Sequence, residues 1–202
     1  MHELRPGLWH WEAPHPEWEP GSEWDEVVSS YAVDDGERLL LFDPLEVPGE
    51  LEARARERET ALVLTCPWHE RDARRLVERL GAPVFVPPAH EGSSDVAWLA
   101  NGEVESHLFS AGDRLPVGVE AFSGREPNDL VLWVESHRAL VAGDTLIDRG
   151  RGLEIPDDWL PQAVSREQVA DGLRALLELP VEHVLATHGR PTDRAALERA
   201  LA

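Results

Sequence analysis

Apolar and polar residues alternate with the period of β-strands in both halves of the chain. Residues 27–33 and 38–42 are apolar runs of strand length, and Asp34-Asp35-Gly36 between them has the composition of a hairpin turn. A similar pair of runs, residues 129–135 and 139–142, follows in the second half. We therefore predict a β-hairpin in the first half and a second pair of adjoining strands in the other.

The rest of the pattern separates further strands from helices. We expect strands at residues 61–65, 83–86, 105–109, 117–122 and 184–187. We expect helices at residues 48–58, 69–80, 93–100, 166–179 and 192–201, the last one capped by Thr192. Because each half supplies strands first and helices after them, we predict an α+β fold. Two mixed sheets would pack face to face with helices outside, and residues 1–202 would form one domain.

Charge and composition exclude several classes of function. The chain of 202 residues has a formal net charge of -20 and contains no lysine, and no basic stripe interrupts the acidic composition. Such a surface repels phosphate backbones and anionic lipids, so we expect no nucleic-acid and no membrane partner. No apolar run reaches the length of a membrane span, about 20 residues. With one cysteine and no apolar leader, the chain is expected to be cytoplasmic.

Polar residues with metal-binding or catalytic chemistry stand just beyond the ends of buried apolar runs. Asp144 and His188 each follow such a run directly. A third run ends in the segment Cys66-Pro67-Trp68-His69-Glu70-Arg71-Asp72. α/β folds present their ligand-binding groups beyond the carboxyl ends of strands, so we expect these residues to gather at one site.

The order of these landmarks resembles the metallo-β-lactamase superfamily, including its glyoxalase II-like members. The landmarks are Leu41-Phe42-Asp43-Pro44, the strand ending in Thr65, the turn at residues 124–127, Gly143-Asp144-Thr145 and Thr187-His188-Gly189. The resemblance covers nearly the whole chain. It implies a four-layer αββα sandwich and a hydrolase-like site that binds metal.

The ligand positions of that superfamily are largely substituted here. In the family, the strand-end Thr is followed by His-x-His-x-Asp-His, which supplies four ligands to a two-metal site. The matching residues are Cys66, Trp68, Glu70 and Arg71, and a later histidine ligand matches Arg125. The resemblance thus implies that the first metal site, which needs three imidazoles, is lost. Asp144 and His188 match the remaining ligands, and with Glu70 they would hold a single divalent cation such as zinc.

Two arginines point to a different outcome for the same site. Arg71 and Arg125 bring fixed positive charge, and a guanidinium cannot be deprotonated to make room for a metal. They would pair with Glu70 and Asp144, replace the charge of the metal and leave a site for a small anion. In that case the protein holds no cofactor.

Another register of the segment 66–72 remains open. Inserting one residue after Thr65 places His69 and Asp72 on ligand positions in place of Trp68 and Arg71. The cluster would then be His69, Asp72, Asp144 and His188, which suits one metal. The extra residue would form a bulge at the strand end, and bulges often lie beside active sites.

We consider three functions. The first is a non-catalytic protein that binds a small molecule or anion, with Arg71, Arg125, Trp68, Cys66 and Asp72 as binding residues. The second is a hydrolase of a small ester or thioester with a single-metal site, using Asp144, His188, Glu70 and His69. In the third, Cys66 is a nucleophile with His69 as its base. We favour the first, because few ligands survive. The sequence gives neither the substrate nor the oligomeric state.

Overall fold

The computed structural model describes residues 1–90 and 96–202. The described residues form two mixed β-sheets. The strands of the first sheet are β1 (His2–Arg5), β2 (Leu8–Pro14), β3 (Val27–Asp34), β4 (Arg38–Phe42), β5 (Glu59–Val63), β6 (Val84–Val86) and β7 (Ser106–Leu108). They lie in chain order across the sheet, antiparallel from β1 to β4 and parallel from β4 to β7.

The second half of the chain builds the other sheet. Its strands are β8 (Arg114–Leu115), β9 (Val119–Glu126), β10 (Asp129–Val134), β11 (Ala139–Val141), β12 (His183–Leu185) and β13 (Thr192–Asp193). Their order across the sheet is β13-β12-β11-β10-β9-β8. Only β11 and β12 pair in parallel among these strands, so the ends of both open toward the same edge of the sandwich.

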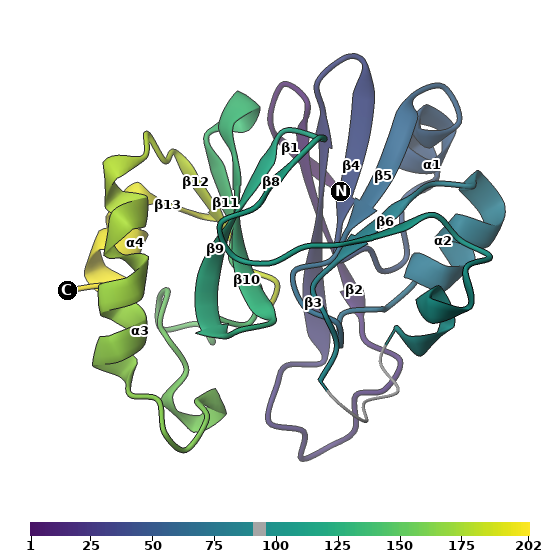
Figure 1. Cartoon of the computed structure of the whole chain (residues 1–202). Helices are drawn as coiled ribbons and strands as arrows, with labels where there is room; N and C mark the ends of the chain where they lie inside the picture. The colour runs from purple at the N-terminus through teal and green to yellow at the C-terminus, as the bar shows by residue number, and fades with distance from the viewer. Residues whose placement is uncertain (91–95) are drawn as a thin grey trace.

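Helices cover the outer face of each sheet (Figure 1). The α-helices are α1 (Gly49–Ala55), α2 (Ala73–Leu80), α3 (Arg166–Leu173) and α4 (Arg194–Ala200). Short 3₁₀ helices are η1 (Ala97–Asn101), η2 (Glu135–His137), η3 (Asp157–Trp159) and η4 (Arg174–Glu178). The first two α-helices pack on the first sheet and the last two on the second, which gives the predicted αββα order.

Buried apolar residues fill all three interfaces between the layers. Tyr31, Phe42, Leu130 and Leu132 are fully buried between the two sheets, where inward-facing side chains of both sheets meet. This central layer fixes the sheets against each other, so the loops at the ends of their strands are held on a rigid frame.

Several sequence predictions of element boundaries were wrong. The helix expected at residues 69–80 begins only at Ala73, because Arg71 adopts a left-handed backbone with φ of 44°. The last helix is capped by Asp193, whose carboxylate accepts the Ala196 N–H at 2.9 Å, and not by Thr192. The helix expected at residues 93–100 lies partly outside the described residues. None of the helices in the described part of the chain combines the length and the apolar character of a membrane span.

Candidate functional site

The carboxylate of Asp144 stands at the centre of the site, and a tight turn places it there. Gly143, just after β11, has φ of 55°, and a Cβ at this position would come within 2.5 Å of Asp129 Oδ1. That oxygen accepts the N–H of Asp144 at 3.1 Å. Glycine is therefore needed for the turn, and buried Asp129 holds the backbone of Asp144 in place.

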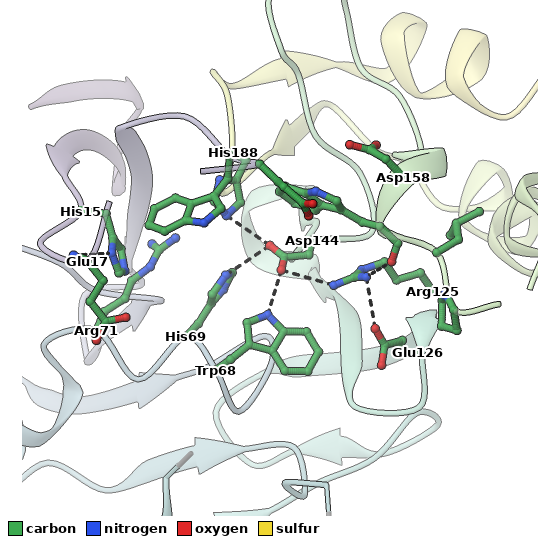
Figure 2. Close-up of a pocket in the computed structure, with 15 residues that line it drawn as sticks. His15, Glu17, Trp68, His69, Arg71, Arg125, Glu126, Asp144, Asp158 and His188 are labelled. Carbon is green, nitrogen blue, oxygen red and sulfur yellow. Dashed lines mark hydrogen bonds and ion pairs between the residues drawn. The ribbon is translucent and has the colours of Figure 1, made fainter. Parts of the chain in front are cut away.

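Both oxygens of Asp144 are surrounded by nitrogen atoms (Figure 2). Oδ1 lies 3.2 Å from Nε2 of His69 and 3.4 Å from Nε2 of His188. Oδ2 accepts the indole N–H of Trp68 at 2.8 Å and lies 3.5 Å from Nη2 of Arg125. Although burial opposes ionisation, the charge of His69 and the nearby nitrogen of His188 hold the pKa of Asp144 well below its usual range. Asp144 is thus an anion enclosed by donors.

His69 lies between two carboxylates. Its Nδ1 is 3.1 Å from Oδ2 of Asp43, on the side opposite to Asp144. Asp43 is fully buried after β4, where it also accepts hydrogen bonds from the Thr65 N–H at 2.9 Å and hydroxyl at 2.6 Å. Burial disfavours the charged ring, but Asp144 and Asp43 outweigh it and raise the pKa of His69 to about 9. At neutral pH His69 is therefore an imidazolium that links the two sheets.

His188 approaches Asp144 from the turn after β12. The ring is buried, and its Nδ1 has no hydrogen-bond partner among the described residues. Trp24 and Trp159 meet the ring edge-on, at centroid distances of 5.9 and 5.2 Å. Burial lowers the pKa of His188, although Asp144 opposes this shift. We infer that His188 is neutral beside the charged His69.

Arg125, at the end of β9, is a cation that the protein itself neutralises. Its Nε donates to Asp129 Oδ2 at 2.9 Å, Nη1 lies 3.1 Å from Oε1 of Glu126, and Nη1 also donates to the carbonyl of Trp159. The guanidinium lies 5.7 Å from the ring centre of Trp68 and 5.9 Å from that of Trp159. The predicted pairing with Asp144 is present only as a long contact, since Asp129 is the nearer partner.

Arg71 does not pair with Glu70 or Asp144 as the charge argument predicted. Its Nη1 donates to the carbonyl oxygens of Asp43 at 2.7 Å and of Ser29 at 2.9 Å. The left-handed backbone at Arg71 turns this side chain toward the first sheet, so its contacts are to neutral backbone oxygens. The ion network expected from the sequence is therefore built by His69 and Arg125 instead.

Two other predicted site residues, Glu70 and Asp72, lie away from the cavity wall. Glu70 is not among the residues that line the cavity described below, and its carbonyl accepts the N–H of Ala73 at 2.8 Å as α2 begins. Asp72 accepts the N–H of Glu46 at 2.7 Å and pairs with Arg75 at 2.6 Å, so it organises the start of α2. A ligand role for either carboxylate therefore finds no support in its position.

Cys66 lies fully buried at the base of the site. Its Sγ, a nitrogen of His69 and an oxygen of Asp144 lie within 4.8 Å of one another, which makes them a candidate metal-binding group. Burial and the charges of Asp144, Asp129 and Asp43 raise the thiol pKa well above its ordinary value. The thiol is therefore protonated at neutral pH, which opposes the nucleophile hypothesis.

Asp144 and the charged or imidazole side chains around it form the floor of a cavity of about 660 Å³. We call this group, which consists of Asp144, His69, His188 and Arg125, the Asp144 cluster. Its walls include the side chains of Trp24, Trp68, Trp159, Leu160 and Pro161. Acidic groups, Glu17, Glu23, Glu126 and Asp158, also line it. This volume lies within the range of small-molecule sites, roughly 300–1,000 Å³.

Sequence reasoning missed the wall formed by the loop after β2. This loop brings His15 and Trp24 into the cavity, where their rings meet edge-on at 4.7 Å. Trp159, from the loop after β11, was likewise not assigned to the site. A Pro-rich loop with aromatic residues carries no spacing that fixes where it folds, so only the tryptophan content gave a signal.

Comparison with solved structures identifies the fold. A metallo-β-lactamase from Erythrobacter litoralis is 13% identical, with 99% of this chain and 93% of that chain covered and a TM-score of 0.67. The DIM-1 metallo-β-lactamase is 14% identical, with 99% of this chain and 93% of that chain covered and a TM-score of 0.67. TTHA1623, solved in a di-iron-bound form, is 25% identical over 86% of this chain and 93% of that one, with a TM-score of 0.60. The chain has the metallo-β-lactamase fold. No family model and no curated protein matches the sequence.

Two of the side chains around Asp144 have no atom that could ligate a metal. Trp68 and Arg125 are both in contact with Asp144 Oδ2. An indole N–H and a guanidinium are donors only, so neither can ligate a metal. What remains around Asp144 is the group of Cys66 and His69, with His188 on the other side.

Proposed function

We propose that this protein binds a small molecule in the cavity and is not a two-metal hydrolase, because side-chain cations take the place of metal ions around Asp144. The position of His69 carries the proposal. Its ring nitrogens face carboxylate oxygens of Asp43 at 3.1 Å and Asp144 at 3.2 Å. A ring held between two carboxylates stays protonated on both nitrogens and has no lone pair left for a metal.

Trp68 and Arg125 support the proposal from the other oxygen of Asp144. Both place nitrogen donors on Oδ2, and the Arg125 guanidinium adds positive charge there. A divalent cation at this oxygen would meet a guanidinium that cannot give up its proton. The cavity above the cluster keeps its aromatic walls, so binding remains while metal chemistry is lost.

A hydrolase with one metal is the second candidate, favoured by the grouping of Cys66, His69 and Asp144. Thiolate, imidazole and carboxylate are ordinary zinc ligands. To bind, Cys66 and His69 would each have to lose a proton. The nearby carboxylates oppose both losses, and the charge of the metal would have to offset them. The Cys66 nucleophile is set aside, since its thiol is buried and protonated.

Metal content tests these candidates. After incubation with zinc and dialysis, we expect well below one equivalent of zinc per chain by elemental analysis. One tightly held equivalent would favour the single-metal hydrolase, and close to two equivalents would overturn the proposal.

The double variant Trp68→His/Arg125→His tests the site from the other direction. It places two imidazoles beside Asp144 and removes the fixed charge, so calorimetry should show tighter zinc binding than in the parent. Arg174→His serves as a matched control, because Arg174 pairs with Asp171 and neither residue lines the cavity. Zinc affinity unchanged in the double variant would mean that Trp68 and Arg125 do not occupy former ligand positions.

A further inference from the structure

Arg71 carries an unused hydrogen-bonding edge at the wall of the cavity. Its Nη1 is occupied by the carbonyl oxygens of Asp43 and Ser29 and lies 3.4 Å from the hydroxyl of Ser30. Its Nε and Nη2 are buried and have no hydrogen-bond partner among the described residues. These two nitrogens form the side of a guanidinium that pairs with both oxygens of a carboxylate or phosphate.

Leaving this edge unpaired is costly for the folded protein. The hydrogen bonds of Arg71 in the described chain all go to uncharged oxygens, and Asp43 and Asp144 support its charge only without direct pairing. A buried guanidinium without a hydrogen-bonded carboxylate lacks part of the compensation that buried charges normally have. Arg125, on the other side of the cavity, differs in this respect, since Asp129 and Glu126 neutralise it. Arg71 is therefore the cation of the cavity lining that keeps unfilled hydrogen-bonding capacity.

His15 adds a second donor to the same wall. Its Nδ1 accepts the backbone N–H of Glu17 at 3.3 Å, so the neutral ring carries its proton on Nε2. Burial and the charge of Arg71 lower the pKa of His15 to about 4, which keeps the ring neutral at pH 7. Figure 2 shows His15 and Arg71 on one side of the cavity, with Asp144 between them and Arg125.

The other lining groups restrict the ligand to a single negative charge. Glu17, Glu23, Glu126 and Asp158 line the cavity, and a multiply charged anion would be repelled by all of them. The centre of the Trp24 ring lies 4.7 Å from that of His15 and 5.9 Å from that of His188. The indole therefore extends from the side of the cavity that holds His15 and Arg71 to the floor at Asp144. A planar apolar group would pack against it.

We propose that the cavity binds a small aromatic monocarboxylic acid, whose carboxylate pairs with Nε and Nη2 of Arg71 and whose ring packs against Trp24. This inference names the ligand class of the proposed binding function and rests on it. The acid is recognised by its carboxylate, and no covalent step is involved.

Phenylacetate and its neutral analogue phenylacetamide are the probes that test this inference. Calorimetric titration of the intact chain should show phenylacetate binding at least about tenfold more tightly than phenylacetamide or inorganic phosphate. Arg71→Lys keeps a cation that can donate to the backbone carbonyls but lacks the two-pronged edge. It should weaken phenylacetate roughly tenfold or more and leave phenylacetamide unchanged. Arg174→Lys, a control at an exposed residue that pairs with Asp171 and does not line the cavity, should change neither affinity.

The outcomes separate this inference from the proposed function. Equal affinities for phenylacetate and phenylacetamide would overturn the carboxylate assignment while small-molecule binding stands. Absence of binding by either probe would overturn the ligand class, whereas the zinc measurements above decide separately on metal binding. If Arg71→Lys does not fold, the side-chain Nε resonance of Arg71 in the parent gives the answer. A shift on addition of phenylacetate but not of phenylacetamide is expected, and an unmoved resonance would overturn the inference.

Discussion

At the residue scale, His69 compensates a group of buried carboxylates that would otherwise repel one another. Burial and the charge of Asp144 raise the pKa of Asp129 to about 7. For Asp43 and Asp144, burial acts in the same direction, but His69 outweighs it and lowers both pKa values. One imidazolium therefore allows two buried carboxylates, each on a different sheet, to stay ionised.

Replacing His69 should change how stability depends on pH. The folded pKa of about 9 exceeds the ordinary value of 6.5, so this ring contributes stability that is complete below about pH 6.5 and disappears as the pH rises through 9. The shift corresponds to roughly 3 kcal/mol. We expect the free energy of unfolding of the parent, measured by urea denaturation, to fall between pH 7 and 9.5. In His69→Gln it should be lower at pH 7 and nearly flat over that range.

His107→Gln provides the control for this experiment. His107 is half-exposed and pairs with Glu105 far from the site, so its loss should leave the alkaline slope of the parent intact. A His69→Gln protein that loses stability above pH 7 as steeply as the parent would show that the His69 ring is not charged.

The residues around Asp144 show which contacts could be predicted from the sequence and which could not. Asp144 and His188 were placed correctly beside each other, because a residue just past a buried strand has few directions in which to point. The side chains of segment 66–72 were not placed correctly. Arg71 adopts a left-handed backbone conformation that usually falls on glycine, and no glycine in this segment indicates the turn. Trp68 and His69 both reach Asp144, while Glu70 and Asp72 lie at the start of α2. The catalytic, binding and metal roles assigned to these residues remain predictions.

At the scale of elements, the strands were predicted more accurately than the helix ends. The hairpin of β3 and β4 is where the alternation placed it, because burial of one face fixes strand register. Helix ends depend on single side-chain contacts, which a hydrophobic pattern does not record. Thr192 and Asp193 are both good caps by residue type, and only the contact with the Ala196 N–H distinguishes them.

Removing the Asp193 carboxylate should therefore destabilise the protein through α4. In Asp193→Ala the N–H of Ala196 loses its partner, and we expect a loss of about 1 kcal/mol in the free energy of unfolding. Thr192→Ala is the matched control and should cost clearly less. Thermal or urea unfolding of the two variants measures the difference. The opposite ranking would mean that Thr192 caps the helix after all.

At the scale of the whole molecule, the two sheets share one core and one site. The apolar layer between them is buried, and the site is completed from both sides, by Asp43 and His69 of the first sheet and by Asp144 and His188 of the second. Neither half could keep this arrangement without the other. We still expect residues 1–202 to form a single domain. In that case both sheets unfold together.

Tyr31 offers a direct test of this cooperativity. Its hydroxyl, on β3 of the first sheet, donates a buried hydrogen bond at 2.6 Å to the carbonyl of Ala186, just after β12 of the second. Tyr31→Phe leaves that carbonyl without this donor and should cost about 1–3 kcal/mol. If the sheets form one cooperative unit, native-state hydrogen exchange will show an equal loss of protection for amides of β5 and of β11. Loss of protection in only one sheet would instead show that the two halves unfold as separate units, each with its own stability.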